Sequence, residues 1–280
     1  MSSLHRLLAA TLVLGSLSFL PGIARAAQSH DSCTGFIDSV PTTISKAGVW
    51  CLRKDLGTNV SSGAAITIAA NNVTIDCNDF KLGGLAAGDG SGARGIHAYA
   101  RQNATVRHCN VRGFFVGIDL SGGAGHLVQD NRLDNNLYVG LSVYGDNSIV
   151  QRNRVYGTGG ATNMSYSYGI IAKADVIDNT VEQVFARAAD AWPRGIELYG
   201  PGRVVRNNRV RRLTASGAGT AVGISVDSPG MIADGNQIYS RNPNGGTGIG
   251  GSNGFCRNNT VAGLSIAIAN CQDAGGNAYL

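Results

Sequence analysis

Apolar and polar residues alternate along most of the chain beyond about residue 60, in runs of four to six residues. Successive side chains of a β-strand point to opposite faces, so this alternation predicts short strands. No long apolar segment with the 3.6-residue period of a helix interrupts the pattern. We therefore expect an all-β protein.

The alternating segments belong to a repeat. A glycine followed by a branched apolar residue recurs every 22 to 29 residues, at Gly95-Ile96, Gly117-Ile118, Gly140-Leu141, Gly169-Ile170, Gly195-Ile196, Gly223-Ile224 and Gly248-Ile249. Between these pairs lies a second motif, apolar-x-x-Asn-x-apolar, centred on Asn131, Asn153, Asn179 and Asn208 and continued by Asn236 and Asn259. A period in the twenties indicates a solenoid. Leucine is too sparse for a leucine-rich repeat, so several short strands per turn are expected.

These two motifs resemble those of the right-handed parallel β-helix superfamily typified by pectate lyases. The resemblance covers about residues 60 to 280 and implies a single-stranded solenoid of about eight turns. It also implies that the asparagines stack from turn to turn into a hydrogen-bonded ladder, a use that suits a side chain with both donors and an acceptor.

The N-terminal segment predicts export. An apolar run from Leu7 to Leu20 follows Arg6, and Ala24-Arg25-Ala26 has the small-x-small pattern of a cleavage site. We assign residues 1–26 to a signal peptide, 27–60 to an N-terminal cap and 61–280 to the β-helix. The chain is expected to be secreted or periplasmic and monomeric, with neither a membrane nor a nucleic acid as partner.

Six cysteines in an exported chain favour three disulfides. Cys77 and Cys109 occupy positions where later turns have the ladder asparagine, so they are expected to stack and can bond. Cys271 lies about one short turn after Cys256. The remaining cysteines, Cys33 and Cys51, are expected to tie down the N-terminal cap.

Arginine dominates the basic residues. The formal net charge is +5, with 19 arginines and four lysines. One outward line follows the asparagine motif and holds Arg132, Arg154 and Arg209. Such a row would favour the binding of a polyanion, although a solvated β-surface that resists aggregation is the simpler interpretation.

The candidate catalytic and binding residues lie on the outward side of the Gly-Ile strands. Alternation places the following residues there: His97, Tyr99, Asp119, Ser121, Ser142, Tyr144, Ile171, Lys173, Glu197, Tyr199, Ser225 and Asp227. The extra length of the longer repeats falls at one corner, in segments 157–167, 183–194, 211–221 and 240–247. We expect these loops to form a wall beside the strands and so a groove. Arg187, Trp192 and Arg194 in this wall suit sugar rings and uronate carboxylates.

The enzymatic hypothesis is β-elimination on an acidic polysaccharide, which needs a base, an acid and a group that neutralises the uronate. Lys173 would be the base, and Tyr144 or Tyr199 the acid. Asp119 and Glu197 would orient the sugar or hold calcium, the candidate ion. His97 faces Asp119 one turn on and is assigned to substrate binding. No catalytic motif of the family is matched, so these roles follow from position alone.

Three other functions stay open. A glycoside hydrolase would need paired carboxylates about 5 to 9 Å apart, and the loose acids Asp175, Asp178 and Asp190 form no such pattern. A non-catalytic glycan-binding or periplasmic accessory scaffold is the main alternative. The chain also resembles β-helix proteins that assist copper delivery to nitrous-oxide reductase, but its histidines and methionines are scattered. An adhesin or structural protein would have no groove.

Overall fold

The computed structural model describes residues 32–162, 164–241 and 245–280. The predicted signal peptide lies outside these residues, as do parts of the corner segments 157–167 and 240–247. Among the residues described, no helix is long and apolar enough to cross a membrane.

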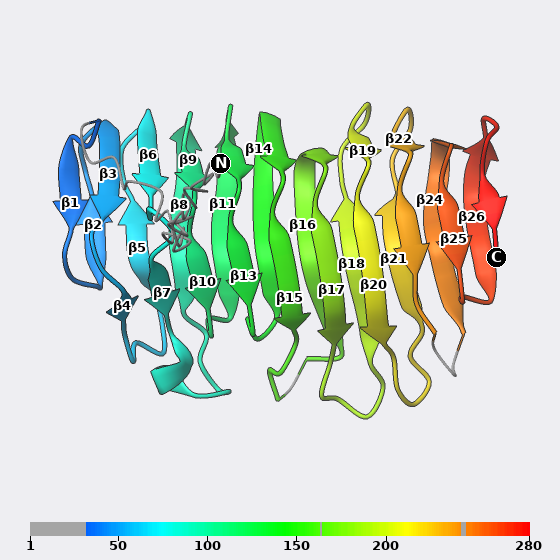
Figure 1. Cartoon of the computed structure of the whole chain (residues 1–280), viewed down its shortest axis with the longest axis horizontal. Coiled ribbons are helices and arrows are strands. Elements are labelled where there is room, and N and C mark those ends of the chain that lie inside the picture. Colours follow the sequence, from blue (N-terminus) through cyan, green and yellow to red (C-terminus); the bar gives the residue numbers. More distant parts are fainter. Residues whose placement is uncertain (1–31, 163, 242–244) are drawn as a thin grey trace, which may run out of the picture.

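The chain winds into a parallel β-helix of about nine turns, one more than expected (Figure 1). Every pairing between its named strands is parallel, and three ladders run along the solenoid. The first ladder carries the Gly-Ile motif and consists of β2 (Thr42–Ile44), β5 (Ala64–Ile68), β8 (Arg94–Gln102), β11 (Val116–Ala124), β14 (Val139–Gln151), β16 (Tyr166–Ile177), β18 (Trp192–Leu198), β21 (Ala221–Val226), β24 (Gly246–Arg257) and β26 (Ile266–Asp273).

The second ladder consists of short strands and the C-terminal parts of β14, β16 and β24. Its separate strands are β1 (Gly35–Ile37), β3 (Gly48–Leu52), β6 (Val73–Asp76), β9 (Thr105–Arg107), β12 (Leu127–Gln129), β19 (Val204–Arg206) and β22 (Ile232–Asp234).

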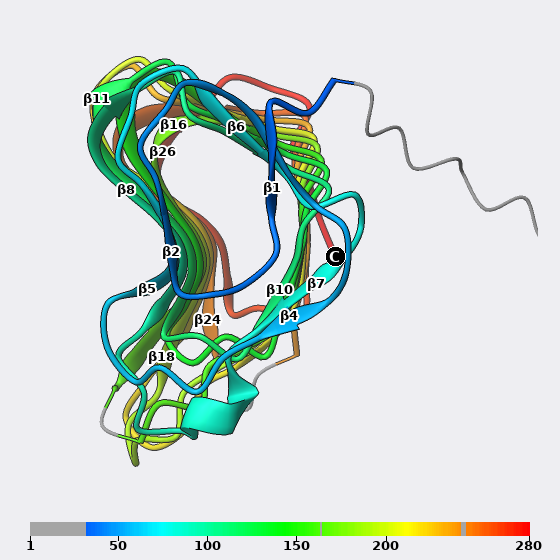
Figure 2. The ribbon, with the colours of Figure 1, turned by 90° about the vertical axis from the view of Figure 1, so that its left-hand side faces the viewer.

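The third ladder is a separate sheet of ten strands. They are β4 (Leu56–Gly57), β7 (Lys81–Gly83), β10 (Asn110–Arg112), β13 (Arg132–Asp134), β15 (Arg154–Thr158), β17 (Thr180–Phe185), β20 (Arg209–Thr214), β23 (Gln237–Tyr239), β25 (Thr260–Ala262) and β27 (Ala278–Tyr279). A 3₁₀ turn, η1 (Leu85–Ala87), follows β7. Viewed along the solenoid, the first and third ladders lie on opposite sides (Figure 2).

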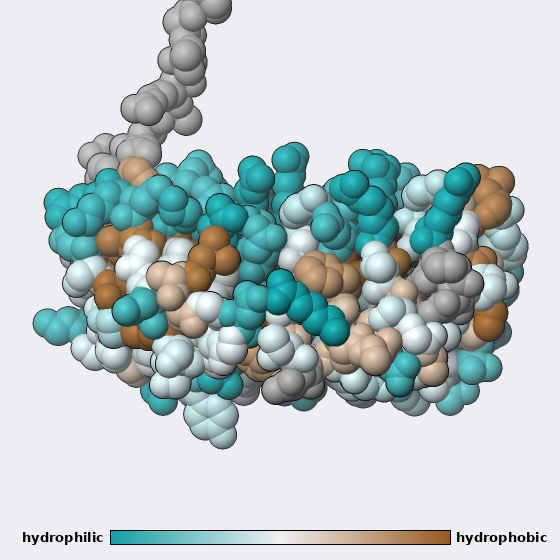
Figure 3. Space-filling model, turned by 90° about the horizontal axis from the view of Figure 1, so that it is seen from below, coloured by the Kyte–Doolittle hydropathy of each residue, from teal (hydrophilic) through white to brown (hydrophobic). Residues whose placement is uncertain are grey.

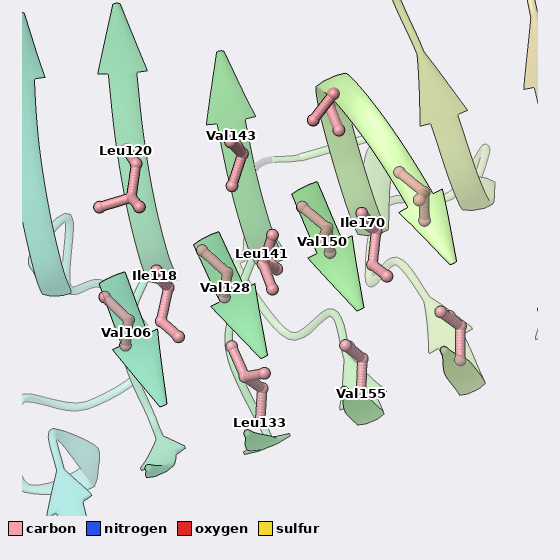
Figure 4. Close-up of a cluster of buried hydrophobic side chains, with 14 of the residues drawn as sticks. Val106, Ile118, Leu120, Val128, Leu133, Leu141, Val143, Val150, Val155 and Ile170 are labelled. Carbon is pink, nitrogen blue, oxygen red and sulfur yellow. The ribbon is translucent and has the colours of Figure 1, made fainter. Parts of the chain in front are cut away.

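The core consists of columns of equivalent side chains, one residue per turn (Figure 4). Ile118, Leu141 and Ile170 are register partners and fully buried, and Val106, Val128 and Val150 form a second column. The glycine of each Gly-Ile pair follows from this stacking. A Cβ on Gly117 would lie 2.6 Å from the carbonyl oxygen of Gly140 on the next turn, so no larger residue fits there.

The predicted asparagine ladder is present. The side-chain amide of each asparagine donates to the Oδ1 of the next one at 2.9–3.0 Å, in the order Asn131, Asn153, Asn179, Asn208, Asn236, Asn259 and Asn277. Each of these Oδ1 atoms also accepts the backbone N–H of the preceding asparagine. The ladder therefore satisfies buried backbone groups at every turn, as polar groups in a core require.

The cysteines pair as their positions suggested. Cys77 bonds to Cys109 in the interior, Cys33 to Cys51 near the N-terminal end, and Cys256 to Cys271 near the C-terminal end. Strands β1 to β4, within the predicted cap 27–60, already pair in parallel with the following turns.

The long segments gather at one corner, as expected. Each joins a third-ladder strand to the next first-ladder strand, β15 to β16, β17 to β18 and β20 to β21. They project at the bottom of Figure 1 and at the lower left of Figure 2, beside the outer side of the first ladder. A backbone bridge between Ala191 and Ser216 and a bond from the Ala218 N–H to Asp190 tie two of them together.

Candidate functional site

The outer side of the first ladder presents its side chains in rows, because register partners stack from turn to turn. We call the outward residue that follows each Gly-Ile pair the central row; it holds His97, Asp119, Ser142, Ile171, Glu197 and Ser225. Alternation placed these residues outside correctly. Yet Asp119 is only 6% exposed and Glu197 only 8%. The sheet bows inward here (Figure 2), and neighbouring side chains shield the row.

Asp119 is the centre of a hydrogen-bonded cluster. Its carboxylate accepts hydrogen bonds from Arg94 Nε at 2.7 Å, Ser121 Oγ at 2.6 Å and Ser142 Oγ at 3.2 Å, and His97 Nδ1 lies 3.2 Å away. Burial alone would raise the pKa of Asp119, but the contacts with His97, Ser121 and Arg94 outweigh it and lower the pKa. The carboxylate is therefore charged at neutral pH and holds its neighbours in place.

Glu197 forms a second cluster on β18. The Tyr199 hydroxyl donates a hydrogen bond to Glu197 Oε1, and Arg194 Nε lies 3.7 Å from Oε2. Burial and the hydrogen bond to Glu197 raise the pKa of Tyr199. This phenol therefore stays protonated and acts as a donor.

The three residues expected to carry catalysis lie close together. Tyr144 and Lys173 are register partners on neighbouring turns, and the Tyr144 and Tyr199 rings are 5.9 Å apart. Burial, followed by the charge of Glu197, raises the pKa of Tyr144 to about 12. Lys173 Nζ forms an ion pair with Asp146 at 2.9 Å, and Arg203 binds the same carboxylate oxygen at 3.0 Å.

A band of aromatic rings crosses four turns beside these clusters. We call Phe115, Tyr138, Tyr168, Tyr166 and Trp192 the aromatic band. Neighbouring ring centroids are 4.9 to 6.3 Å apart, and three of the four contacts are stacked. The rings are partly exposed, and Tyr166 is 40% exposed. Arg194 lies over Tyr166 at 5.9 Å, so it joins the band to Glu197.

The predicted wall residues separate into two groups. Trp192 and Arg194 lie on β18 and belong to the outer side of the first ladder. Arg187 lies in the corner and forms an ion pair with Asp89, which is 98 residues away in the sequence.

Asp119 and Glu197 do not form a close pair. Asp119 and Glu197 are separated by three strand spacings, or about 14 Å between backbones. Among the loose acids, Asp175 and Asp190 accept hydrogen bonds from the backbone N–H groups of Val204 and Ala218. No group of three or more His, Cys, Asp or Glu side chains within the described ranges is arranged to hold a metal ion. Calcium bound together with a substrate carboxylate stays a prediction.

Several residues of the face were missing from the sequence prediction. Arg94 directly precedes the Gly95-Ile96 pair, and strict alternation counted back from His97 would have turned it inward with Ile96. It lies outside because a Cβ on Gly95 would point at the buried Val111, so Gly95 and Ile96 both face the interior and the alternation shifts by one residue. No sequence motif indicated Asp146 or Arg203, because the contacts of Asp146 with Lys173 and with Arg203 depend on how the turns after the strands are folded.

The chain belongs to the family described as "Right handed beta helix region", which it matches over residues 56–210. This confirms the right-handed parallel β-helix. A comparison with curated proteins finds no sequence that matches.

Similar folds occur among solved structures. The catalytic domain of a GH87 α-1,3-glucanase in complex with nigerose has a TM-score of 0.49 and 13% identity, covering 88% of this chain and 60% of that one. DFA-IIIase from Arthrobacter chlorophenolicus without its lid gives 0.44 and 13%, with 81% and 68% covered. The Dettilon tailspike protein gives 0.35 and 15%, with 85% and 60% covered. The chain thus spans about three fifths of the first of these proteins, and the likeness concerns the fold.

Proposed function

We propose that this protein binds a polysaccharide along the outer side of the first ladder, in the secreted or periplasmic space. The observation that carries the proposal is the aromatic band, which follows the solenoid axis with partly exposed rings. Aromatic faces stack on the apolar faces of sugar rings, and a row of them suits a chain of sugars.

The clusters beside the band supply polar contacts for such a chain. Glu197 can accept a hydrogen bond from a sugar hydroxyl, as it already does from Tyr199, and Asp119 holds Arg94 and His97 in place beside it. Tyr144, with its raised pKa, donates at neutral pH. Arg194 lies over Tyr166 of the band and can hold a carboxylate by a two-point fork, which supports an acidic polymer over a neutral one. Lys173 lies farther along β16 and is paired with Asp146.

β-Elimination is the second candidate, and the proximity of Tyr144, Lys173 and Tyr199 favours it. In this hypothesis Lys173 removes the C5 proton of a uronate and a tyrosine protonates the leaving oxygen. The bond between C4 and the glycosidic oxygen breaks as the C4–C5 double bond forms, so the product absorbs ultraviolet light. The carboxylate pair required for hydrolysis is not formed by Asp119 and Glu197.

One experiment tests both candidates. Mature protein is titrated with pectate, alginate, hyaluronan and neutral galactan, with calcium present or chelated, while binding and ultraviolet absorbance are followed. An aromatic contact is worth about 0.5–1.5 kcal/mol beyond the area it buries. Replacing Tyr166 and Trp192 by alanine should therefore weaken binding about tenfold or more. Absorbance that grows with wild type and is abolished by Lys173→Ala would establish elimination.

The matched control is Phe255→Ala. Phe255 lies on the second ladder and is 40% exposed, the same as Tyr166, so its loss should leave binding unchanged. Equal effects of the two changes, or no binding to any polymer in the panel, would contradict the proposal. Binding without a change in absorbance would leave a non-catalytic glycan-binding scaffold.

A further inference from the structure

The outer side of the third ladder carries an unusual charge pattern. Its strands alternate as well, and the middle residues Leu133, Val155 and Val210 are buried. The outward rows on either side are rich in arginine. One row runs Lys81, Asn110, Arg132, Arg154, Thr180, Arg209 and Gln237, and the other runs Gly83, Arg112, Asp134, Tyr156, Glu182, Arg211 and Tyr239.

The acids of these rows already have ion-pair partners. Asp134 pairs with Arg112 at 3.2 Å, and Glu182 pairs with Arg212 at 2.5 Å. Arg132, Arg154 and Arg211 are exposed, and in the part of the chain that the structure describes they have no ion pair or hydrogen bond. Arg209 has only a long bond to Gln237, at 3.3 Å.

This arrangement costs the fold free energy. Arg132 and Arg154 are direct register partners, so their backbones are about 4.8 Å apart. Like charges directly opposite each other on neighbouring strands are destabilising. Charged residues often protect an edge strand from aggregation. That explanation does not apply, because β13 and β15 are paired on both sides.

The surface is hollowed at the same place. A recess of about 370 Å³ is lined by Arg132, Arg154, Arg209 and Arg211, with Tyr156, Thr180 and Glu182 between them. The neighbouring hollow on one side shares Arg132 and is also lined by Asp55, Asp79 and Asp134. The one on the other side shares Thr180 and Arg209 and is also lined by Asp178. The hollows therefore continue one another along the solenoid axis. In Figure 3 the third ladder lies along the upper edge, which is almost entirely hydrophilic.

We propose that this surface, which we call the arginine trough (Arg132, Arg154, Arg209 and Arg211), binds a linear polysaccharide that carries carboxylates. Guanidinium groups hold carboxylates by a two-point fork, and here they come from β13, β15 and β20, with Thr180 and Glu182 on the turn between β15 and β20. Tyr156, 42% exposed, lies beside these arginines, with Arg212 over one face of its ring at 6.0 Å. Three disulfides are typical of an oxidising compartment outside the cytosol, which favours a glycan over an intracellular nucleic acid as the polyanion.

The trough is independent of the aromatic band, since the two lie on opposite sides of the solenoid (Figure 2). It goes beyond the proposed function by giving the protein a second binding surface with a preference for anions. A chain held in the trough would keep the protein on an acidic matrix while the first ladder stays accessible.

The test uses polygalacturonate, alginate and hyaluronan as ligands and neutral galactan as the uncharged comparison. Arg132→Gln/Arg154→Gln should weaken binding to at least one of these uronans tenfold or more, and should flatten its dependence on salt. The control is Arg53→Gln/Arg257→Gln, which removes the same charge from exposed arginines paired with Asp38 and Asp234. This control should bind as wild type does. Because the trough variant removes a repulsion, its urea unfolding midpoint should not fall.

Four outcomes would overturn the inference. The first two are no binding to any of the three uronans, and an equal loss of uronan binding in the two arginine double variants. The third is a loss of uronan binding that occurs only when Tyr166 and Trp192 are replaced. The fourth is single-stranded DNA that binds at the same arginines more tightly than the uronans do. Loss of trough binding alone leaves the aromatic band to be judged by its own variants, so the two proposals can fail separately.

Discussion

At the scale of single residues, the Asp119 cluster makes a prediction about pH. Asp119→Asn leaves Arg94 and His97 without their charged partner, and such hydrogen bonds are worth about 1.5–3 kcal/mol. The pKa of Asp119 is lowered in the folded state, so its contribution is present above the unfolded pKa of about 3.9 and is lost as the pH falls through the folded pKa. Urea unfolding should show variant and wild type separated by about 2 kcal/mol at pH 7 and converging below about pH 4.

Asp146→Asn is the control for this experiment. Asp146 also has a lowered pKa, through its hydrogen bond with Lys173, but it is fully exposed to solvent screening. It should shift the unfolding midpoint much less than Asp119→Asn. If the Asp119 difference stayed constant down to acid pH, the cluster would not depend on the charge of this carboxylate.

The sequence predicted which residues point outward, and the contacts among them were largely beyond it. Alternation is a local property of each strand, so it placed Tyr144, Lys173 and Glu197 on one face. The burial of Glu197 depends on the curvature of the sheet and on Tyr199 covering it. The ion pair of Lys173 with Asp146 joins residues 27 apart through a turn that no repeat motif describes.

At the scale of elements, the asparagine ladder predicts position-dependent stability. Asn179 is buried; its amide donates to the Val150 and Ile177 carbonyls and to Asn208, and its Oδ1 accepts the Asn153 N–H. Asn179→Asp keeps the shape but turns the donor into an oxygen that faces three acceptors. Asn179→Ala leaves the same groups unpaired without adding a charge. Each unsatisfied group costs about 1–3 kcal/mol, so both changes should lower the urea midpoint, the aspartate more.

Asn277→Ala provides the comparison at the other end of the ladder. Asn277 is the last member and only partly buried, so water replaces its bonds and the loss should be smaller. An equal effect at the two positions, or an aspartate that is tolerated at 179, would mean that the ladder contributes little to the fold.

The fold itself could be predicted because it is a repeat. Each turn contacts only its neighbours, so the Gly-Ile and asparagine motifs carry nearly all the information that the architecture needs. The same motifs placed Cys77 and Cys109 one above the other. The motifs did not show how far the solenoid extends toward the N-terminus, because β1 to β4 pair in register without containing either motif.

At the scale of the whole molecule, a solenoid is stable in its middle and weakest at its ends, where a turn lacks one neighbour. The last strand of the first ladder, β26, has no fully buried residue, and the Cys256–Cys271 disulfide ties it to β24. A disulfide that closes a loop of about 15 residues stabilises by about 3 kcal/mol in the chain-entropy model. In Cys256→Ser/Cys271→Ser, hydrogen exchange should therefore speed up in β26 and β27 while β14 to β18 keep their protection. The middle turns hold both the aromatic band and most of the arginine trough, so glycan binding should survive this local opening. Faster exchange spreading evenly into β14 to β18 would instead mean that the solenoid opens as one unit, and binding at both faces would then depend on the terminal disulfide.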